Sequence, residues 1–327
     1  LEGTQTPEPG TSGPRGKAEH MTTRGEERRV VFRSVDDAPG STLESPAALP
    51  GGVAEALVSL VASNRAGRGL SSLCAPSFFE RALPLLERAR DVVIVTGFFI
   101  PACIAPETDG PGGSVVLGRA LERLGKKVRI VTDVLCFDAV SACSSSVGGP
   151  SVLSVSSSGA MLTDGGDLLV FIERVGRASD GRYYNMRRED ITRWVVPLDD
   201  TALTALARGI PVLGVGDGGN EAGMGYFREL FPSVLPDFAE CCSVVPSTCA
   251  LPVDVSSWGA YALAAALSVR NGRWLGHTDD EEIAMLRAMC DAGAVDGVTR
   301  RRDLSVDQFP RDEILGVVRG IRSVCPD

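Results

Sequence analysis

Short apolar segments that alternate with helical patterns constrain the fold of this chain more than any other feature of its sequence. Both faces of each segment are expected to be covered, because none shows the polar alternation of a half-exposed strand. The sequence therefore predicts an α/β fold: a doubly wound, mostly parallel sheet with helices on both faces, Rossmann-like, in a single domain. The strand-like segments are 91–98 (DVVIVTGF), 127–132 (KVRIVT), 167–173 (DLLVFIE) and 210–215 (IPVLGV).

Helical patterns separate and follow these segments. The most apolar of them, Trp258–Val269, is shorter than the roughly 18 residues that a membrane span requires, so it is interpreted as a buried helix. The Ser- and Gly-rich stretch 141–159 predicts a mobile surface excursion, with an active-site lid as the alternative. Helices are expected near 52–64, 76–89, 113–124, 200–208, 258–270, 279–292 and 311–323.

Residues 1–45 are rich in Gly, Pro, Thr, Glu and Arg and have almost no apolar periodicity, which predicts a disordered leader. The folded domain is expected at 46–327. The step from His20 to Met21 is consistent with an engineered junction, which would make residues 1–20 non-native. Acidic residues argue against an organelle presequence in this leader: Glu2, Glu8, Glu19, Glu26 and Glu27.

Charge and cysteine usage exclude several classes of function. The net charge is −9 and no basic stripe is present, so no nucleic-acid partner is expected. Nine cysteines without CxxC pairs, and only two histidines, favour a reducing, intracellular compartment and argue against structural zinc. No GxGxxG follows the first strand, so neither nicotinamide nor flavin is expected. A small-molecule substrate and no membrane partner are expected, and homo-oligomerisation stays open.

Parallel sheets bind ligands at the carboxyl ends of their strands, so the loops there are the first candidates for a site. After segment 91–98 come Glu107, Thr108 and Asp109, which precede a Gly/Pro turn and a helix. The carboxylates could bind a cation or transfer protons, and the helix amides could bind an anion. An ordinary capped turn is the alternative. Asp133 ends the second strand, where a helix cap is the alternative.

The third strand ends at Glu173 and Arg174 and runs into a loop dense in polar and aromatic groups. A guanidinium from Arg174 or Arg187 would suit a substrate carboxylate. The alternative is a surface loop held by ion pairs. The loop contains Asp180, Tyr183, Tyr184, Asn185, Met186 and Arg187.

The strongest local signal is VLGVGDGGNEAGMG at 212–225, where a strand runs into glycines interrupted by Asp217, Asn220 and Glu221. Glycines permit positive φ angles and close approach of the backbone to a ligand. A purely structural turn rarely needs so many of them, which favours a binding or catalytic loop.

Three blocks, ETDGPGG at 107–113, IERVGRASDGRYYNMR at 172–187 and GDGGNEAGMG at 216–225, occur in this order. Together they resemble the C-terminal domain of D-glutamate cyclase, from about residue 50 to the C-terminus. The resemblance implies a hydro-lyase that reversibly dehydrates D-glutamate to 5-oxo-D-proline. It also implies the mitochondrial matrix if the source is eukaryotic, and the cytoplasm if it is bacterial.

Such a cyclisation requires removal of protons from the ammonium, protonation of the side-chain carboxyl group and stabilisation of an oxyanion. With His277 the only histidine outside the leader, carboxylates are the expected proton carriers. Arg174 or Arg187 is expected to bind the α-carboxylate, and the 216–220 amides to face the oxyanion. A divalent cation, Mn or Mg, is expected at Asp217, Glu107 and Asp133. The catalytic candidates are Glu107, Asp109, Asp217 and Glu221, and the further substrate-binding candidates are Thr108, Glu173, Asn185, Gly218, Gly219 and Asn220.

Two other functions stay open. One is a non-catalytic regulatory domain that binds an acidic metabolite. The other is a haloacid dehalogenase-like phosphohydrolase, because the segment GDGGNE of this chain resembles the metal-binding loop of those enzymes. Those enzymes need a nucleophilic Asp two residues before a second Asp after the first strand, where this chain has Thr96-Gly97-Phe98. A phosphatase assay with a generic ester would separate the two chemistries.

Overall fold

The computed structural model describes residues 49–157 and 166–325, all within one compact unit, Pro46–Asp327. The predicted leader, 1–45, and the end of the predicted excursion, 158–159, lie outside the described residues, so those predictions stay open.

The centre of the fold is a parallel sheet in the strand order β5-β4-β1-β6-β7-β8. This order confirms the predicted doubly wound architecture, and the direction of winding reverses between β1 and β6. Ligands of such sheets bind outside the carboxyl ends of the strands at this switch point. The strands are β1 (Asp91–Thr96), β4 (Lys127–Thr132), β5 (Ser151–Ser154), β6 (Leu168–Ile172), β7 (Val212–Gly216) and β8 (Cys249–Pro252).

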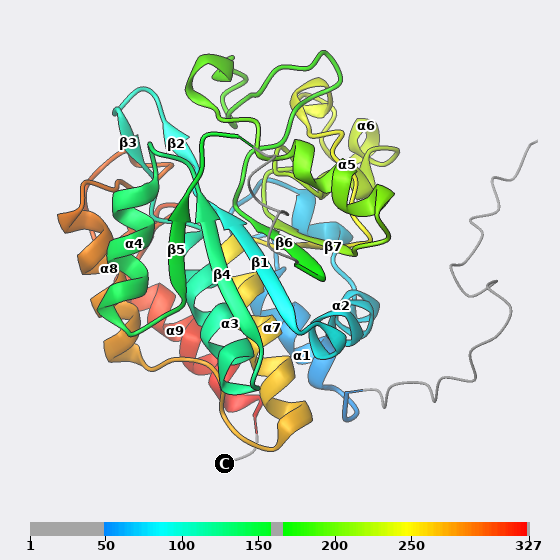
Figure 1. Cartoon of the computed structure of the whole chain (residues 1–327), viewed down its shortest axis with the longest axis vertical. Coiled ribbons are helices and arrows are strands. Elements are labelled where there is room, and N and C mark those ends of the chain that lie inside the picture. Colours follow the sequence, from blue (N-terminus) through cyan, green and yellow to red (C-terminus); the bar gives the residue numbers. More distant parts are fainter. Residues whose placement is uncertain (1–48, 158–165, 326–327) are drawn as a thin grey trace, which may run out of the picture. The chain divides into compact units, whose positions relative to one another are not determined.

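Alternate residues of each central strand enter two different cores. Val92 and Ile94 of β1 pack in the main core, and Val93 and Val95 pack in a second core on the other face. The main core holds α3 and α7, which lie against the sheet in Figure 1, and the second core holds α5. The continuous apolar pattern of the strands is therefore explained, because helices cover both faces. The longer helices are α1 (Val53–Val61), α2 (Pro76–Arg88), α3 (Pro111–Arg123), α4 (Phe137–Ser146), α5 (Asp200–Ala207), α7 (Ser256–Asn271), α8 (Asp279–Asp291) and α9 (Arg311–Ser323).

Smaller elements complete the fold. The short helix α6 (Phe231–Val234) follows the glycine-rich loop of β7. Two antiparallel pairs, β2 (Phe99–Ile100) with β3 (Ala105–Pro106) and β9 (Ser305–Val306) with β10 (Phe309–Pro310), shape the loops between helices and strands.

The stretch 141–157 differs from the predicted surface excursion. Its first part completes α4, and its second part forms β5, which pairs with β4 at the edge of the sheet. The Ser144 hydroxyl donates to the carbonyl of Pro150 at 2.6 Å and ties the two elements together. An edge strand buries little side-chain surface, so Ser-rich β5 lacks the apolar run that revealed the central strands.

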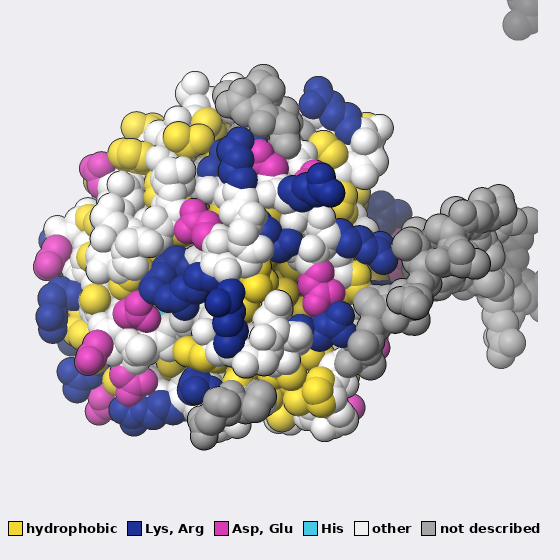
Figure 2. Space-filling model, turned by 60° about the horizontal axis from the view of Figure 1, so that its bottom comes forward, with side chains coloured by type: hydrophobic (Ala, Val, Ile, Leu, Met, Phe, Trp, Pro, Cys, Tyr) yellow, Lys and Arg dark blue, Asp and Glu magenta, His cyan; other side chains and the backbone are white. Residues whose placement is uncertain are grey.

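Within the described ranges, no helix is both long enough and apolar enough to span a bilayer. The apolar helix α7 is instead buried along almost its whole length within the main core. Figure 2 shows one face of the molecule, where basic side chains are interspersed with acidic and apolar ones.

Candidate active site

Carboxylates from three separate loops converge where β1, β6 and β7 end. One carboxylate oxygen each of Asp109, Glu173 and Asp217 lies within 4.8 Å of the others. All three are buried, as is Glu107, whose side chain lies against Glu173 and Asp307. Four of the predicted site residues therefore meet in one buried group, called the acid cluster below: Glu107, Asp109, Glu173 and Asp217.

The first turn of α7 orients this cluster. The Ser256 amide donates to Asp109 Oδ2 at 2.9 Å and to Asp217 Oδ2 at 3.1 Å, and the Ser257 amide donates to Asp109 Oδ1 at 2.9 Å. The Ser256 hydroxyl donates to Glu173 Oε2 at 2.6 Å. The amides at a helix start carry partial positive charge, so the N-terminus of α7 both aims and stabilises the carboxylates.

The backbone around the cluster is tightly constrained. Gly110 has φ 94°, and a Cβ there would lie 2.7 Å from both Glu173 Cβ and Thr96 Oγ1. Glu173 itself has φ 45°, a left-handed conformation that is uncommon outside glycine. Only a residue without a side chain fits at Gly110, and the strained backbone of Glu173 points its carboxylate toward Ser256.

Arg68 contributes a cationic side chain to the cluster, and it is not among the residues predicted for the site. Its guanidinium forms ion pairs with Asp217 and, at 2.9 Å, with Asp307. Arg68 follows α1, far from the strand ends along the chain, so its position gives no sign of a role at the strand ends. The signal present in the sequence is local: Arg68 lies between Gly67 and Gly69, and the structure gives both glycines positive φ.

Burial raises the pKa of the carboxyl groups in the cluster. Desolvation and then repulsion from Asp307 raise the pKa of Glu107 well above its usual value, and the same causes raise the pKa of Asp109 to about 6. Burial also raises the pKa of Asp217, although attraction to Arg68 opposes the shift. Burial lowers the pKa of Arg68, but attraction to Asp217 and Asp307 outweighs this and raises it. The cluster can therefore hold protons at pH values where exposed carboxyls have lost them.

Replacing Glu107 with glutamine is expected to stabilise the protein at high pH. A carboxyl whose folded pKa is raised binds a proton more readily in the native state than in the unfolded chain, so wild-type stability falls as pH rises above the unfolded pKa of about 4. Melting curves in chelator should show Glu107→Gln melting about 3 °C or more above wild type near pH 8, with a smaller difference near pH 5. The exposed control Glu55→Gln should show no such trend, and a lower melting temperature of Glu107→Gln at both pH values would contradict the expectation.

The glycine-rich loop after β7 is folded around its own glutamate. Glu221 accepts hydrogen bonds from the amides of Asp217 (3.1 Å), Gly218 (2.7 Å) and Gly219 (2.8 Å). A Cβ on Gly216 would lie 2.6 Å from Glu221 Oε2, so that glycine makes room for this carboxylate. The loop thus places Asp217 in the cluster, but the amides expected to face an oxyanion already have an acceptor. The predicted oxyanion role of these amides is not supported by this arrangement.

Arg174 does not point into the acid cluster. Its guanidinium is buried and donates to Asp133 Oδ2 at 2.6 Å, to the Gly97 carbonyl at 2.9 Å and to the Val196 carbonyl at 2.7 Å. Asp133 also accepts from the amide of Leu135 at 2.9 Å. This pair ties the ends of β4, β1 and β6 together, so in this structure Arg174 and Asp133 bond to each other and not to the acid cluster, and their predicted roles in binding substrate and metal stay predictions.

We expect Arg174→Lys to lower stability and leave substrate binding unchanged. Lysine has a single nitrogen, which cannot reproduce three separated donor contacts, so the variant should lose about 2 kcal/mol or more of unfolding free energy. Urea titration of the variant beside Arg182→Lys, an exposed control on the same loop, measures this loss. An Arg174→Lys protein with wild-type stability and a raised KM would show instead that the guanidinium binds substrate.

The remaining predicted binding residues make local contacts. The Thr108 hydroxyl donates to the Ser305 carbonyl at 2.8 Å, and the Asn220 amide donates to the Tyr184 carbonyl at 2.8 Å. Asn185 bonds within its own turn to Glu189 at 2.7 Å, and exposed Arg187 donates to the Val298 carbonyl at 3.0 Å. These residues hold the loops around the site, and their predicted contact with substrate stays a prediction.

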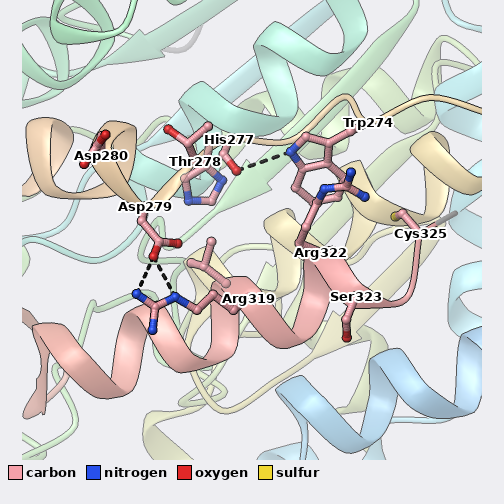
Figure 3. Close-up of a pocket in the computed structure, with 10 residues that line it drawn as sticks. Trp274, His277, Thr278, Asp279, Asp280, Arg319, Arg322, Ser323 and Cys325 are labelled. Carbon is pink, nitrogen blue, oxygen red and sulfur yellow. Dashed lines mark hydrogen bonds and ion pairs between the residues drawn. The ribbon is translucent and has the colours of Figure 1, made fainter. Parts of the chain in front are cut away.

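A separate groove lies beyond the C-terminal end of α7 (Figure 3). Its volume is about 820 Å³, and Arg319 pairs there with Asp279 at 2.6 Å. The acid cluster lies at the N-terminal end of the same helix, so the groove and the cluster are distinct. The groove is lined by Trp274, His277, Thr278, Asp279, Asp280, Val318, Arg319, Arg322, Ser323 and Cys325.

Comparison with known proteins identifies the family. A profile of the family described as "D-glutamate cyclase-like, C-terminal" matches residues 57–322. The human protein named "D-glutamate cyclase, mitochondrial" is 36% identical over 235 residues, which are 65% of this chain and 38% of that protein. The crystal structure of an exopolyphosphatase-related protein from Bacteroides fragilis aligns with a TM-score of 0.39 and 12% identity, covering 78% of this chain and 58% of that one. The chain spans well under half the length of its human relative, and its match over residues 57–322 shows that it belongs to the D-glutamate cyclase-like family.

Proposed function

We propose that this chain catalyses the reversible cyclisation of D-glutamate to 5-oxo-D-proline and water. The observation that carries the proposal is the buried convergence of Asp109, Glu173 and Asp217 at the strand ends of a member of this family. The D-configuration of the substrate is taken from the name of the human relative.

The proton balance of this reaction suits a site made of carboxyl groups. The α-nitrogen forms a bond to the side-chain carboxyl carbon, and one carbon–oxygen bond of that carboxyl breaks. The ammonium loses two protons, and the departing oxygen gains two and leaves as water, so no net proton is taken up. The enzyme must therefore accept protons at one atom and donate them at another, which a carboxyl with a raised pKa can do near neutral pH.

Glu107 is the proposed proton carrier, and Asp217 is the charged carboxylate proposed to lie beside it. Burial raises the pKa of both groups, and Glu107 Oε1 has no hydrogen-bond partner among the described residues, so it is free to exchange a proton with a ligand. Asp109 is held by three backbone amide contacts and is proposed to fix the geometry of the cluster.

Arg68 is the proposed carboxylate anchor, a role predicted from the sequence for Arg174 or Arg187. Its guanidinium has five N–H donors, and its contacts to Asp217 and Asp307 use only part of them. A substrate carboxylate bound beside Arg68 would place the substrate against the acid cluster. Holding glutamate in a ring-like pose can itself contribute several kcal/mol to lowering the barrier.

Isotope labelling tests this function on the full chain. The protein is incubated with 5-oxo-D-proline in ¹⁸O-water, and the products are resolved chirally and weighed by mass spectrometry. We expect D-glutamate that carries one ¹⁸O in its side-chain carboxylate, because the added water oxygen enters at the lactam carbon. The forward reaction is followed with D-glutamate, and L-glutamate serves as the control.

Two results would overturn the proposal. The first is binding of D-glutamate or 5-oxo-D-proline, seen by calorimetry, without any interconversion in either direction; this result would favour a regulatory domain. The second is hydrolysis of a generic phosphate ester without lactam formation, which would favour phosphoryl transfer.

A further inference from the structure

The acid cluster carries more negative charge than its protein partners neutralise. Within the described part of the chain, Arg68 is the only side-chain cation paired with these acids, through Asp217 and Asp307. Arg174 lies nearby but is already paired with Asp133. Uncompensated buried charges are costly, so proteins pair them, protonate them or bind metal ions to them. The buried acids of this region are Glu107, Asp109, Glu173, Asp217, Glu221 and Asp307.

The geometry of three of these acids suits a cation. Oxygens of Asp109, Glu173 and Asp217 lie within 4.8 Å of one another, although the residues come from three different loops. Ligand oxygens around a Mg²⁺ ion at about 2.1 Å are separated by about 3 to 4 Å, so small side-chain adjustments would complete such a shell. Each of the three carboxylates is also oriented by Ser256, which donates to all of them. Hydrogen bonds of this kind from outside the shell hold metal ligands in place.

Two buried polar atoms have no hydrogen-bond partner among the described residues, and one of them, in Thr96, lies outside the cluster and is an independent observation. Glu107 is 6% exposed, and its Oε1 has no hydrogen-bond partner among the described residues. Thr96 is fully buried at the end of β1, and within the same residues its Oγ1 also has no partner. Buried polar atoms are rarely left unpaired, so these two point to a ligand that completes their contacts.

We propose that Asp109, Glu173 and Asp217 bind one divalent cation, and that Glu107 lies beside the ion with its carboxyl group left to carry a proton. A set made only of oxygen atoms selects a hard ion such as Mg²⁺ or Mn²⁺ over Zn²⁺, which prefers nitrogen and sulfur. The set differs from the one expected from the sequence, because Asp109 and Glu173 take the places that Glu107 and Asp133 were expected to fill. When bound, the ion would present positive charge to a substrate that carries two carboxylates, and in this respect the inference rests on the proposed function.

Metal binding can be measured without turnover. The full chain is treated with chelator, desalted and titrated with MnCl₂ while free Mn²⁺ is followed by electron paramagnetic resonance. We expect one saturable site in the wild type, competition by MgCl₂, and a rise in melting temperature with either ion. Glu173→Gln should weaken Mn²⁺ binding about tenfold or more, and the exposed control Glu240→Gln should bind as wild type does.

The outcomes separate this inference from the proposed function. Absence of saturable Mn²⁺ and Mg²⁺ binding by the folded wild type at millimolar concentrations would overturn the metal site, even if D-glutamate is cyclised in chelator. Unchanged Mn²⁺ affinity in a Glu173→Gln protein with a cooperative melt would overturn it too. Saturable binding that is lost in Glu173→Gln, together with no turnover of glutamate or 5-oxoproline, would support the metal site while overturning the proposed function.

Discussion

Asp217→Asn is expected to reduce kcat/KM for cyclisation of D-glutamate about 10³-fold, within the range that general acid–base groups contribute. Asparagine keeps the shape of the side chain and can still accept from the Ser256 amide, which now donates to Asp217 at 3.1 Å. It lacks the negative charge that pairs with Arg68 and that the proposed cation requires. Activity should therefore fall far more than stability.

Rates at saturating and limiting D-glutamate, measured on protein with a cooperative melt, provide the test. The matched control is Asp237→Asn, which removes an exposed carboxylate and should keep wild-type rates. A folded Asp217→Asn protein that turns over D-glutamate at the wild-type rate would remove Asp217 from the chemistry.

The largest loss of stability is expected for Arg68→Met. The methionine fills a similar volume but leaves Asp217 and Asp307 buried without their shared cation. Removal of one partner from a buried ion pair typically costs about 3 to 5 kcal/mol, which corresponds to a fall of roughly 6 °C or more in melting temperature for a domain of this size. Turnover should also be lost, because the proposed carboxylate anchor is absent.

Thermal melts and urea titrations at neutral pH measure the effect. Arg65→Met, an exposed position on the same loop, is the control and should change stability little. Arg68→Lys should fall between the two, since one ammonium keeps the charge but cannot span both carboxylates. If Arg68→Met were as stable as the wild type, Asp217 and Asp307 would have to be neutralised in another way. The proposed role of Arg68 in binding the substrate carboxylate would then depend only on the KM of the variant.

The central fold could be predicted because its signals are local. The apolar runs of β1, β4, β6 and β7 fill two cores, and their order along the chain with intervening helices specifies a doubly wound sheet. Edge strand β5 and the short strand β8 escaped prediction, because β5 exposes polar residues and β8 has only four residues.

The carboxylates of the acid cluster could be predicted from the sequence, whereas the arginine that pairs with them, Arg68, could not. Strand-end position alone brought Glu107, Asp109 and Asp217 into consideration, and the structure places them together. The choice between Arg68 and Arg174 depends on which carboxylate each guanidinium reaches in three dimensions. Arg174 follows a strand end but pairs with Asp133 at the end of another strand, a contact that only the sheet order creates.

The contacts of Ser256 also could not be predicted from spacing along the sequence. It lies 39 residues from Asp217 and 147 residues from Asp109 along the chain, yet its amide contacts both carboxylates. A helix was predicted near 258–270 from its apolar composition, but Ser256 lies before that range, and the direction of the first amides depends on how α7 packs against α3 and the sheet.

Glu221 affects which anions can bind to the glycine-rich loop. Its carboxylate accepts from the backbone amides of Asp217 to Gly219, which would otherwise be free to bind an inorganic anion. Inorganic phosphate and sulfate should therefore bind weakly to these amides, and phosphate or sulfate buffers should cause little inhibition by binding to this loop. Because its amide donors are already used by Glu221, the loop is expected to bind tetrahedral oxyanions from solution weakly.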